Sequence, residues 1–205
     1  CQALDREATG AKTRYVTVRF GNVLGSTGSV VPLFQRQLAQ GGPLTVTHPE
    51  VTRYFMTVRE AVELILQAST LAIQSNGTVA NPPSATAGQL YVLDMGEPIL
   101  IQHLARQIIR LSGLRPDIDV GIEYIGLRAG EKLSEELFHE YETLEPTAHE
   151  AIRLANTRAI ELPLLTQRLS ELGNHADARR LQPTLGILCE LVPEYKRTPA
   201  ENSSP

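Results

Sequence analysis

The sequence predicts an α/β fold, because short strand-like segments alternate with amphipathic helices along most of its 205 residues. The strand-like segments are rich in β-branched and aromatic residues and end at glycine, asparagine or proline. The helical segments repeat their apolar residues at intervals of three and four. Hydrophobic residues make up 42% of the chain and charged residues 20%, so an ordinary globular core can form.

The first part of the chain predicts strands and helices in alternation. The segment 14–20 (RYVTVRF) favours a strand, with Asn22 just beyond its carboxyl end. Ser29 stands at the N-cap position of a helix expected over 31–39, which Gly41 ends. The next elements are a strand over 44–47, an extended segment over 52–57 and an amphipathic helix over 60–73.

The second part continues the alternation and ends in helices. The small, polar segment 75–88 predicts a mobile surface loop. The elements expected after it are a strand over 89–94, a helix over 101–111, a strand over 120–125, a helix beginning at 131–138 and helical structure over 162–192. We expect one unit over 1–196, followed by a disordered tail over 197–205.

Composition excludes several classes of function. The net charge of −4 argues against a broad electrostatic footprint for nucleic acid. Cys1 and Cys189 are far apart and in no metal-ligand spacing, which predicts neither a disulfide framework nor a metal site. The longest apolar runs are too short to span a bilayer, so we expect no membrane contact.

The start of the chain predicts a fragment of a longer protein. Cys1 opens helix-like sequence without an initiator Met or an N-cap residue before it, and Thr9-Gly10 resembles a helix end. No G-x-G-x-x-G motif follows a strand, so the sequence offers no dinucleotide fingerprint of its own.

Two polar residues stand in apolar or turn-like surroundings. Asn22 follows a strand, where ligands bind in open α/β sheets, although a turn asparagine can also bond its own backbone. Arg53 lies within the extended segment 51–56 and needs a partner, because an unpaired charge is costly to bury. That partner is either a protein carboxylate or an anionic ligand such as a diphosphate.

A third candidate is the loop 126–130, whose glycines bracket Arg128 just before the expected helix. Backbone N–H groups, a helix dipole and a guanidinium in one place favour phosphate binding. Glu131 could accept hydrogen bonds from a ribose, or could simply be a helix-start glutamate that favours the dipole.

Taken together, these segments resemble a known family. The stretches 19–34 (RFGNVLGSTGSVVPLF), 43–68 (PLTVTHPEVTRYFMTVREAVELILQA), 91–98 (YVLDMGEP) and 126–138 (GLRAGEKLSEELF) occur in this order. They closely resemble the C-terminal half of CapD-type polysaccharide biosynthesis proteins. These are NAD-dependent UDP-N-acetylglucosamine 4,6-dehydratases of the extended short-chain dehydrogenase/reductase superfamily. The resemblance implies the last strands of a Rossmann-type sheet, a small substrate-binding subdomain and a helical C-terminal end.

The resemblance also implies roles for individual residues. Asn22 would contact the sugar diphosphate, Arg53 and Arg128 would clamp that diphosphate, and Glu131 would meet the ribose hydroxyls. The uracil pocket and the nicotinamide neighbours complete the implied set: Val31, Pro32, Leu44, Thr45 and Val46 for uracil, and the backbone of Phe20 and Gly21 for the nicotinamide.

The implied function is sugar-nucleotide binding for a bacterial lyase that serves capsule, O-antigen or glycan assembly. Every catalytic residue and most of the NAD(P) site would lie upstream of Cys1, so we expect neither catalysis nor a bound cofactor in this chain alone. A UDP-sugar 4-epimerase fragment and a non-catalytic nucleotide-sugar-binding or assembly module are the alternatives.

The resemblance implies a cytoplasmic enzyme domain, with a parent protein that can be anchored at the inner membrane. With the preceding sheet absent, one apolar face of the strand 14–20 would be uncovered, and exposed apolar edges invite pairing, so a dimer or a rearranged fold can result. We therefore expect a homo-oligomer, and a UDP-sugar as the partner.

Overall fold

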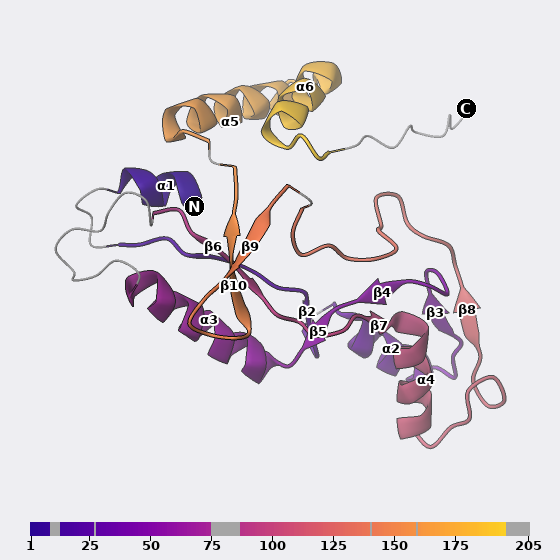
Figure 1. Ribbon diagram of the computed structural model, residues 1–205. Coiled ribbons are helices and arrows are strands. Elements are labelled where there is room, and N and C mark those ends of the chain that lie inside the picture. Colours follow the sequence, from indigo (N-terminus) through magenta and orange to yellow (C-terminus); the bar gives the residue numbers. More distant parts are fainter. Residues whose placement is uncertain (9–12, 27, 75–86, 140, 159, 196–205) are drawn as a thin grey trace.

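The computed structural model describes residues 1–8, 13–26, 28–74, 87–139, 141–158 and 160–195. Strands alternate with helices over this part of the chain, which confirms the expected α/β class (Figure 1). The predicted tail over 197–205 and most of the predicted loop over 75–88 lie outside the described residues.

The larger part of the fold is a four-stranded sheet in the order β1-β6-β10-β9. Its strands are β1 (Thr17–Arg19), β6 (Leu90–Leu93), β10 (Ile152–Asn156) and β9 (Thr143–Pro146). Strand β1 runs parallel to β6, and β10 runs antiparallel to both of its neighbours. The sequence assigned no strand to β9 and β10, although β10 lies inside the sheet.

Helices cover this sheet from both sides. Figure 1 shows α3 (Val58–Gln74) on one side and α1 (Gln2–Glu7) on the other. All four residues of β6 are buried, and Tyr91 and Leu93 pack in one cluster with Ala68 of α3. A strand that is buried on both faces loses the apolar–polar alternation of a half-exposed strand, as β6 does.

The smaller part of the fold has its own core. Strand β3 (Leu44–Val46) pairs in parallel with β8 (Ile122–Tyr124), and α2 (Val30–Ala39) and α4 (Ile101–Leu111) pack beside them. Phe34, Leu44 and Ile109 are fully buried in this cluster. The apolar positions that predicted helices α2 and α4 therefore face each other and β3.

Two short strand pairs join the parts. Strand β2 (Asn22–Val23) runs parallel to β5 (Phe55–Met56), and β4 (Thr52–Arg53) runs antiparallel to β7 (Ile99–Leu100). These pairs bring Asn22 and Arg53, which are far apart in sequence, to the same region.

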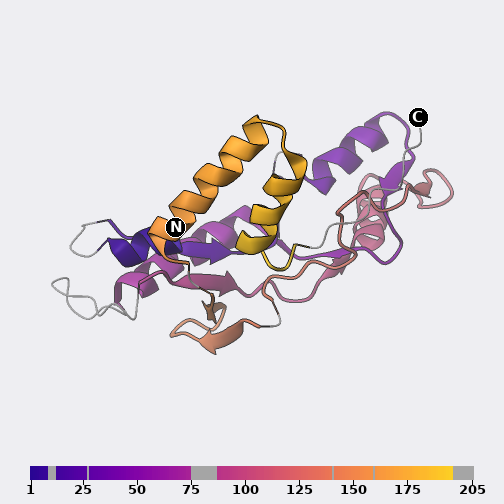
Figure 2. The same ribbon diagram turned by 90° about the horizontal axis from the view of Figure 1, so that it is seen from above.

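Helices α5 (Leu162–Asp177) and α6 (Leu181–Leu191) form a hairpin that confirms the predicted helical C-terminal end. The two helices pack chiefly on each other, and α5 also touches α1 (Figure 2). Among the described residues, no helix is both long and apolar enough to cross a bilayer.

The prediction of a helix beginning at 131–138 is wrong. The segment is irregular, with a turn in which the N–H of Glu131 donates to the carbonyl of Arg128 at 2.9 Å. Its backbone is held by a distant strand, because the N–H of Thr52 donates to the carbonyl of Leu133 at 2.9 Å. A tertiary bond of this kind removes an acceptor that a helix needs, and it overrides the local pattern.

A buried carboxylate ties α1 to the sheet. Asp5 is 4% exposed and accepts two hydrogen bonds from Arg14, at 2.9 and 2.8 Å. The N–H groups of Tyr15 and Gly88 each donate to the same carboxylate at 2.8 Å. Burial alone would raise the pKa of Asp5, but these hydrogen bonds outweigh it and lower the pKa from 3.8 to about 2.

Candidate functional site

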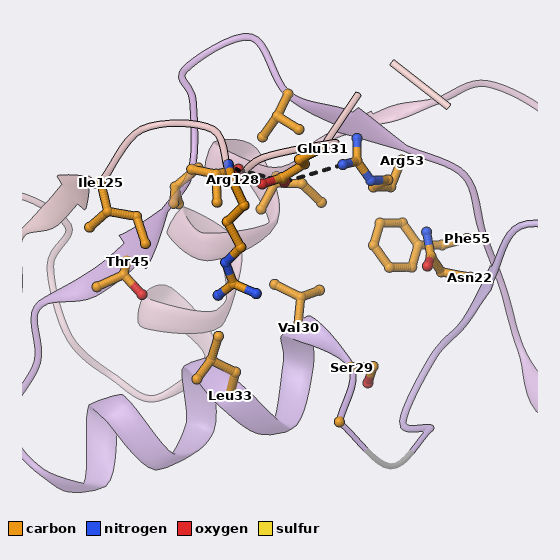
Figure 3. Close-up of a pocket in the computed structure, with 15 residues that line it drawn as sticks. Asn22, Ser29, Val30, Leu33, Thr45, Arg53, Phe55, Ile125, Arg128 and Glu131 are labelled. Carbon is orange, nitrogen blue, oxygen red and sulfur yellow. Dashed lines mark hydrogen bonds and ion pairs between the residues drawn. The ribbon is translucent and has the colours of Figure 1, made fainter. Parts of the chain in front are cut away.

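A cavity of about 410 Å³ opens where the two parts of the fold meet (Figure 3). Its walls come from the start of α2, from strands β3 and β4, and from the loop after β8. The volume lies in the range of pockets that hold small-molecule ligands. The cavity therefore joins segments that are distant in the sequence and is a candidate binding site.

Much of the cavity wall is apolar. Val30 and Leu33 come from α2, Phe55 comes from β5, and Ile125 follows β8. The wall is completed by Val46, Val51 and Ile101, which also belong to or touch the smaller core. A wall of this kind suits the flat face of a ligand and supports the polar groups on a rigid core.

Arg53 stands in the wall and is already bonded to protein. Its Nη1 donates to the carbonyl of Thr52 at 2.7 Å and to that of Leu133 at 3.3 Å. Its Nη2 lies 3.2 Å from Oε1 of Glu131, and both side chains are 20% exposed. Of the two partners that the sequence left open for Arg53, a protein carboxylate is therefore present.

Glu131 connects three segments of the wall. Its Oε1 accepts a hydrogen bond from Thr47 Oγ1 at 2.8 Å as well as the one from Arg53. Its Oε2 accepts the backbone N–H of Arg128 at 3.1 Å. The carboxylate therefore holds the loop of Arg128 against β4 and the end of β3, without the helix that the sequence predicted.

Arg128 differs from Arg53 because its side chain is exposed and extends into the cavity toward Val30 and Leu33 (Figure 3). Within the part of the chain that the structure describes, its guanidinium makes no hydrogen bond or ion pair. An arginine offers five N–H donors in a planar fork that matches phosphate oxygens. Arg128 is thus a cation available to an anionic ligand.

Asn22 lies beside Phe55 at the end of the cavity away from Thr45 (Figure 3). Its Nδ2 donates to the carbonyl of Tyr54 and to Oε2 of Glu135, each at 3.2 Å. Both donors of the amide are then occupied, so the group that Asn22 has left to offer is its acceptor, Oδ1.

Two hydroxyl groups are placed on the wall. Oγ1 of Thr45 accepts a hydrogen bond from Nε2 of Gln37 at 2.7 Å, which leaves its own proton free to donate. Ser29 is the N-cap residue of α2, as predicted, but its buried Oγ has no hydrogen-bond partner among the described residues. The Thr45 hydroxyl can therefore donate to a ligand, whereas the Ser29 oxygen is covered by protein.

The structure brings together six of the sequence-predicted site residues. Asn22, Thr45, Val46, Arg53, Arg128 and Glu131 all line the cavity. Val30 and Leu33 line it on α2, whereas the predicted Val31 packs against the core and Pro32 is partly buried. Leu44 is completely buried in the core beneath the cavity wall.

The predicted nicotinamide neighbours, Phe20 and Gly21, are half-buried and are not among the residues that line the cavity. Phe20 packs against the core cluster under α3, and the N–H of Gly21 points to the sulfur of Met95 at 3.4 Å. A Cβ placed on Gly21 would come within 2.8 Å of the Cβ of Tyr54. Gly21 therefore allows two backbones to approach closely, which any larger residue would prevent.

Sequence reasoning missed several wall residues. Thr47, Val51, Phe55, Ile101, Ile125 and Ser29 line the cavity without having been predicted to do so. Phe55 lies in the same apolar segment as Arg53, so proximity could have suggested it. Thr47 and Ile101 carried no such signal, because their positions depend on long-range pairing.

Over the described ranges, no group of three or more potential ligands is placed to hold a metal ion.

Comparison with known proteins finds one matching family model and several similar sequences. A family model described as polysaccharide biosynthesis protein matches residues 1–157. The capsular polysaccharide biosynthesis protein CapD of Staphylococcus aureus is 51% identical over 142 residues, which are 69% of this chain and 21% of that protein. The UDP-glucose 4-epimerase of Rickettsia akari is 33% identical over 132 residues, 64% of this chain and 33% of that enzyme.

The fold also resembles a solved structure. The X-ray structure of Pen from Bacillus thuringiensis matches with a TM-score of 0.56 and 28% sequence identity. The match covers 78% of this chain and 47% of Pen. The chain thus spans about a fifth to a half of the length of these proteins.

Proposed function

Because this chain belongs to the polysaccharide biosynthesis protein family, whose model matches residues 1–157, we propose that it binds a UDP-sugar for a nucleotide-sugar 4,6-dehydratase. The sugar in this proposal is N-acetylglucosamine. The enzyme works in the cytoplasm, and its product is used to build a bacterial surface glycan. The homo-oligomer stays a prediction.

One observation carries the proposal: the cavity holds an uncompensated guanidinium, that of Arg128, above an apolar wall. Glu131 neutralises Arg53, so Arg128 gives the lining a net positive charge. A nucleoside diphosphate joins an anion to a flat base, and it meets both features.

The two ends of the cavity suit different parts of such a ligand. Thr45 and Ile125 form one end, where the free hydroxyl proton can bond a uracil carbonyl beside an apolar contact. Asn22 and Phe55 form the other end and would meet the sugar (Figure 3). The diphosphate would then lie between them, within reach of Arg128.

Glu131 can still take part in ribose binding. A carboxylate has about four lone-pair sites, and three of those on Glu131 are used by Thr47, Arg53 and the N–H of Arg128. The remaining site can accept one ribose hydroxyl. The other bonds of Glu131 position the loop that carries Arg128.

The proposal assigns catalysis to the whole enzyme. There, bound NAD(P) would carry the hydride that is removed from the sugar and later returned to it. Phe20 and Gly21 would offer that cofactor backbone contacts at most, because Phe20 packs against the core cluster under α3 and Gly21 lies against Tyr54. We therefore expect the isolated chain to form no 4-keto-6-deoxy sugar, which chromatography of a reaction mixture would detect.

A second candidate is a UDP-sugar 4-epimerase, which the 33% identity to the Rickettsia akari UDP-glucose 4-epimerase favours. Both enzymes need the same binding site, so the product of the full-length enzyme distinguishes them. A 4-keto-6-deoxy sugar supports the dehydratase, and a sugar changed only in configuration at C4 supports the epimerase.

The binding experiment is titration calorimetry of the purified chain with UDP. We expect one site, and a roughly thirtyfold loss of affinity in Arg128→Ala, since a charge-assisted hydrogen-bonded pair contributes about 2 kcal/mol. Arg59→Ala is the matched control, because Arg59 is exposed and pairs with Glu63 on the same helix, α3. Equal affinity of Arg128→Ala and the unaltered chain would contradict the proposal.

A further inference from the structure

The charges around the cavity are unevenly distributed. Arg53 and Glu131 form an ion pair and largely cancel. Among the described residues of the wall, Arg128 is then the cation without an ion pair. Glu135 bonds to the lining residue Asn22, and it has no ion pair with any residue that the structure describes. Arg128 and Glu135 are thus a cation and an anion without ion pairs among the described residues, and they lie at different places around the cavity.

Glu135 acts on the cavity through Asn22. Its Oε2 accepts one N–H of the Asn22 amide, and the carbonyl of Tyr54 accepts the other. These two bonds fix the orientation of the amide, so that Oδ1 is the group available to a ligand. The Asn22 end of the cavity therefore presents an acceptor, with a carboxylate directly behind it.

The position of Glu135 is held by its neighbours along the chain. The carbonyl of Leu133 accepts the N–H of Thr52 at 2.9 Å, and Oγ of Ser134 bonds Oγ1 of Thr52 at 3.1 Å. Glu135 itself is partly buried. Because the preceding residues are bonded to β4, the carboxylate cannot easily swing away when a ligand enters.

We propose that Glu135 is a specificity-determining residue that selects uncharged sugars with donor groups and disfavours sugars that carry a carboxylate. A hydroxyl or an amide N–H can donate to Oδ1 of Asn22. A uronic acid instead places a second negative charge near Glu135, where partial burial weakens solvent screening. This inference rests on the proposed binding of a UDP-sugar.

The test compares two ligands that differ only at C6 of the sugar, UDP-glucose and UDP-glucuronic acid. Titration calorimetry of the full chain should give roughly tenfold weaker binding of UDP-glucuronic acid, the size expected for two like charges about 6 Å apart at an effective dielectric constant of about 40, between the values for a protein surface and for bulk water. The substitution Glu135→Gln keeps an acceptor for Asn22 and removes only the charge. It should bring the two affinities to within about twofold of each other.

Glu136→Gln is the matched control, because Glu136 is the next residue, is exposed and pairs with Lys132. It should keep the tenfold preference. Thermal unfolding of each variant shows whether the fold is retained, and Glu135→Asp offers a second variant that keeps the charge and should keep the preference.

The outcomes separate the two proposals. Equal affinity of the unaltered chain for both sugars, or a preference that survives in Glu135→Gln, overturns the role of Glu135 while UDP binding stands. A chain that binds none of UDP, UDP-glucose and UDP-glucuronic acid overturns the proposed function and this inference with it.

Discussion

Two arginine–carboxylate pairs in this molecule have the same chemistry and different surroundings. Asp5 and Arg14 meet at the end of the sheet, where the carboxylate side chain is 1% exposed and receives four hydrogen bonds. Arg53 and Glu131 meet at the cavity, where both side chains are 20% exposed and a single 3.2 Å contact joins them.

This difference in exposure and hydrogen bonding indicates which pair can bind a ligand. The Asp5 pair is bidentate and its carboxylate is buried and accepts four hydrogen bonds, so that carboxylate has little left to offer a ligand. The Arg53 pair is looser and faces a cavity, so either member can exchange part of its bonding for a ligand. Both pairs join an arginine to a carboxylate, so residue type does not distinguish them. The number of hydrogen bonds that each carboxylate already accepts, and its exposure, do.

The largest expected effect is on stability, at the closed pair. Asp5→Ala leaves Arg14 without its carboxylate and removes the acceptor of the Gly88 and Tyr15 N–H groups. We expect a loss of about 3 kcal/mol in the free energy of unfolding, the low end of the range for breaking a buried pair, because Arg14 keeps some contact with water. Urea unfolding followed by circular dichroism measures it.

Glu131→Ala is the matching change at the open pair. It should cost only about 1 kcal/mol, because both side chains are 20% exposed and the contact between Glu131 and Arg53 is long, at 3.2 Å. If Glu131→Ala destabilises the chain as much as Asp5→Ala does, the distinction between a closed and an open pair fails.

The next effect is a dependence of stability on pH that belongs to Asp5. Its folded-state pKa of about 2 lies below the unfolded value of 3.8, so the unfolded chain binds the proton more readily. The stabilisation, about 2 kcal/mol, is therefore complete above pH 4 and is lost as the pH falls from about 4 to 2.

The measurement compares the unaltered chain with Asp5→Asn by urea unfolding at pH 6 and pH 3. The difference between the two proteins should shrink at the lower pH, where other carboxylates titrate equally in both. A difference that is the same at both pH values would show that Asp5 does not carry this linkage.

The helices and the class of the fold could be predicted because their signals are local. The apolar spacing of α2, α3 and α4 predicted each of them to within two residues at either end. Strands β9 and β10 were missed because β10 enters the sheet beside β6, about 60 residues earlier in the chain, and β9 joins the sheet by pairing with β10. The helix at 131–138 failed for the related reason that Thr52 holds Leu133.

The candidate site was predictable where a charged or polar group interrupts an apolar segment or a turn. That rule found Arg53, Arg128 and Asn22, which line one cavity. It could not tell which arginine is neutralised, because the bond between Arg53 and Glu131 joins positions 78 residues apart. Nor could it find Glu135, whose effect on the cavity passes through the amide of Asn22.

The smallest expected effect concerns the share of Arg53 in ligand binding. Arg53→Ala should weaken UDP binding roughly fivefold, about 1 kcal/mol, because its guanidinium keeps bonds to Thr52, Leu133 and Glu131 that a ligand only partly replaces. Arg128, with no such bonds among the described residues, should account for a larger loss. Titration calorimetry of both variants with UDP gives the comparison.

A double variant, with Arg53 and Arg128 both replaced by alanine, tests whether the two arginines contact the same part of the ligand. If both guanidinium groups contact one diphosphate, the two losses should not add, because each substitution changes the charge that the other group meets. Strict additivity would place the two arginines on different parts of the ligand. A larger loss in Arg53→Ala than in Arg128→Ala would reverse the assignment, because the arginine paired with Glu131 would then be the main anion contact and the unpaired one an exposed side chain.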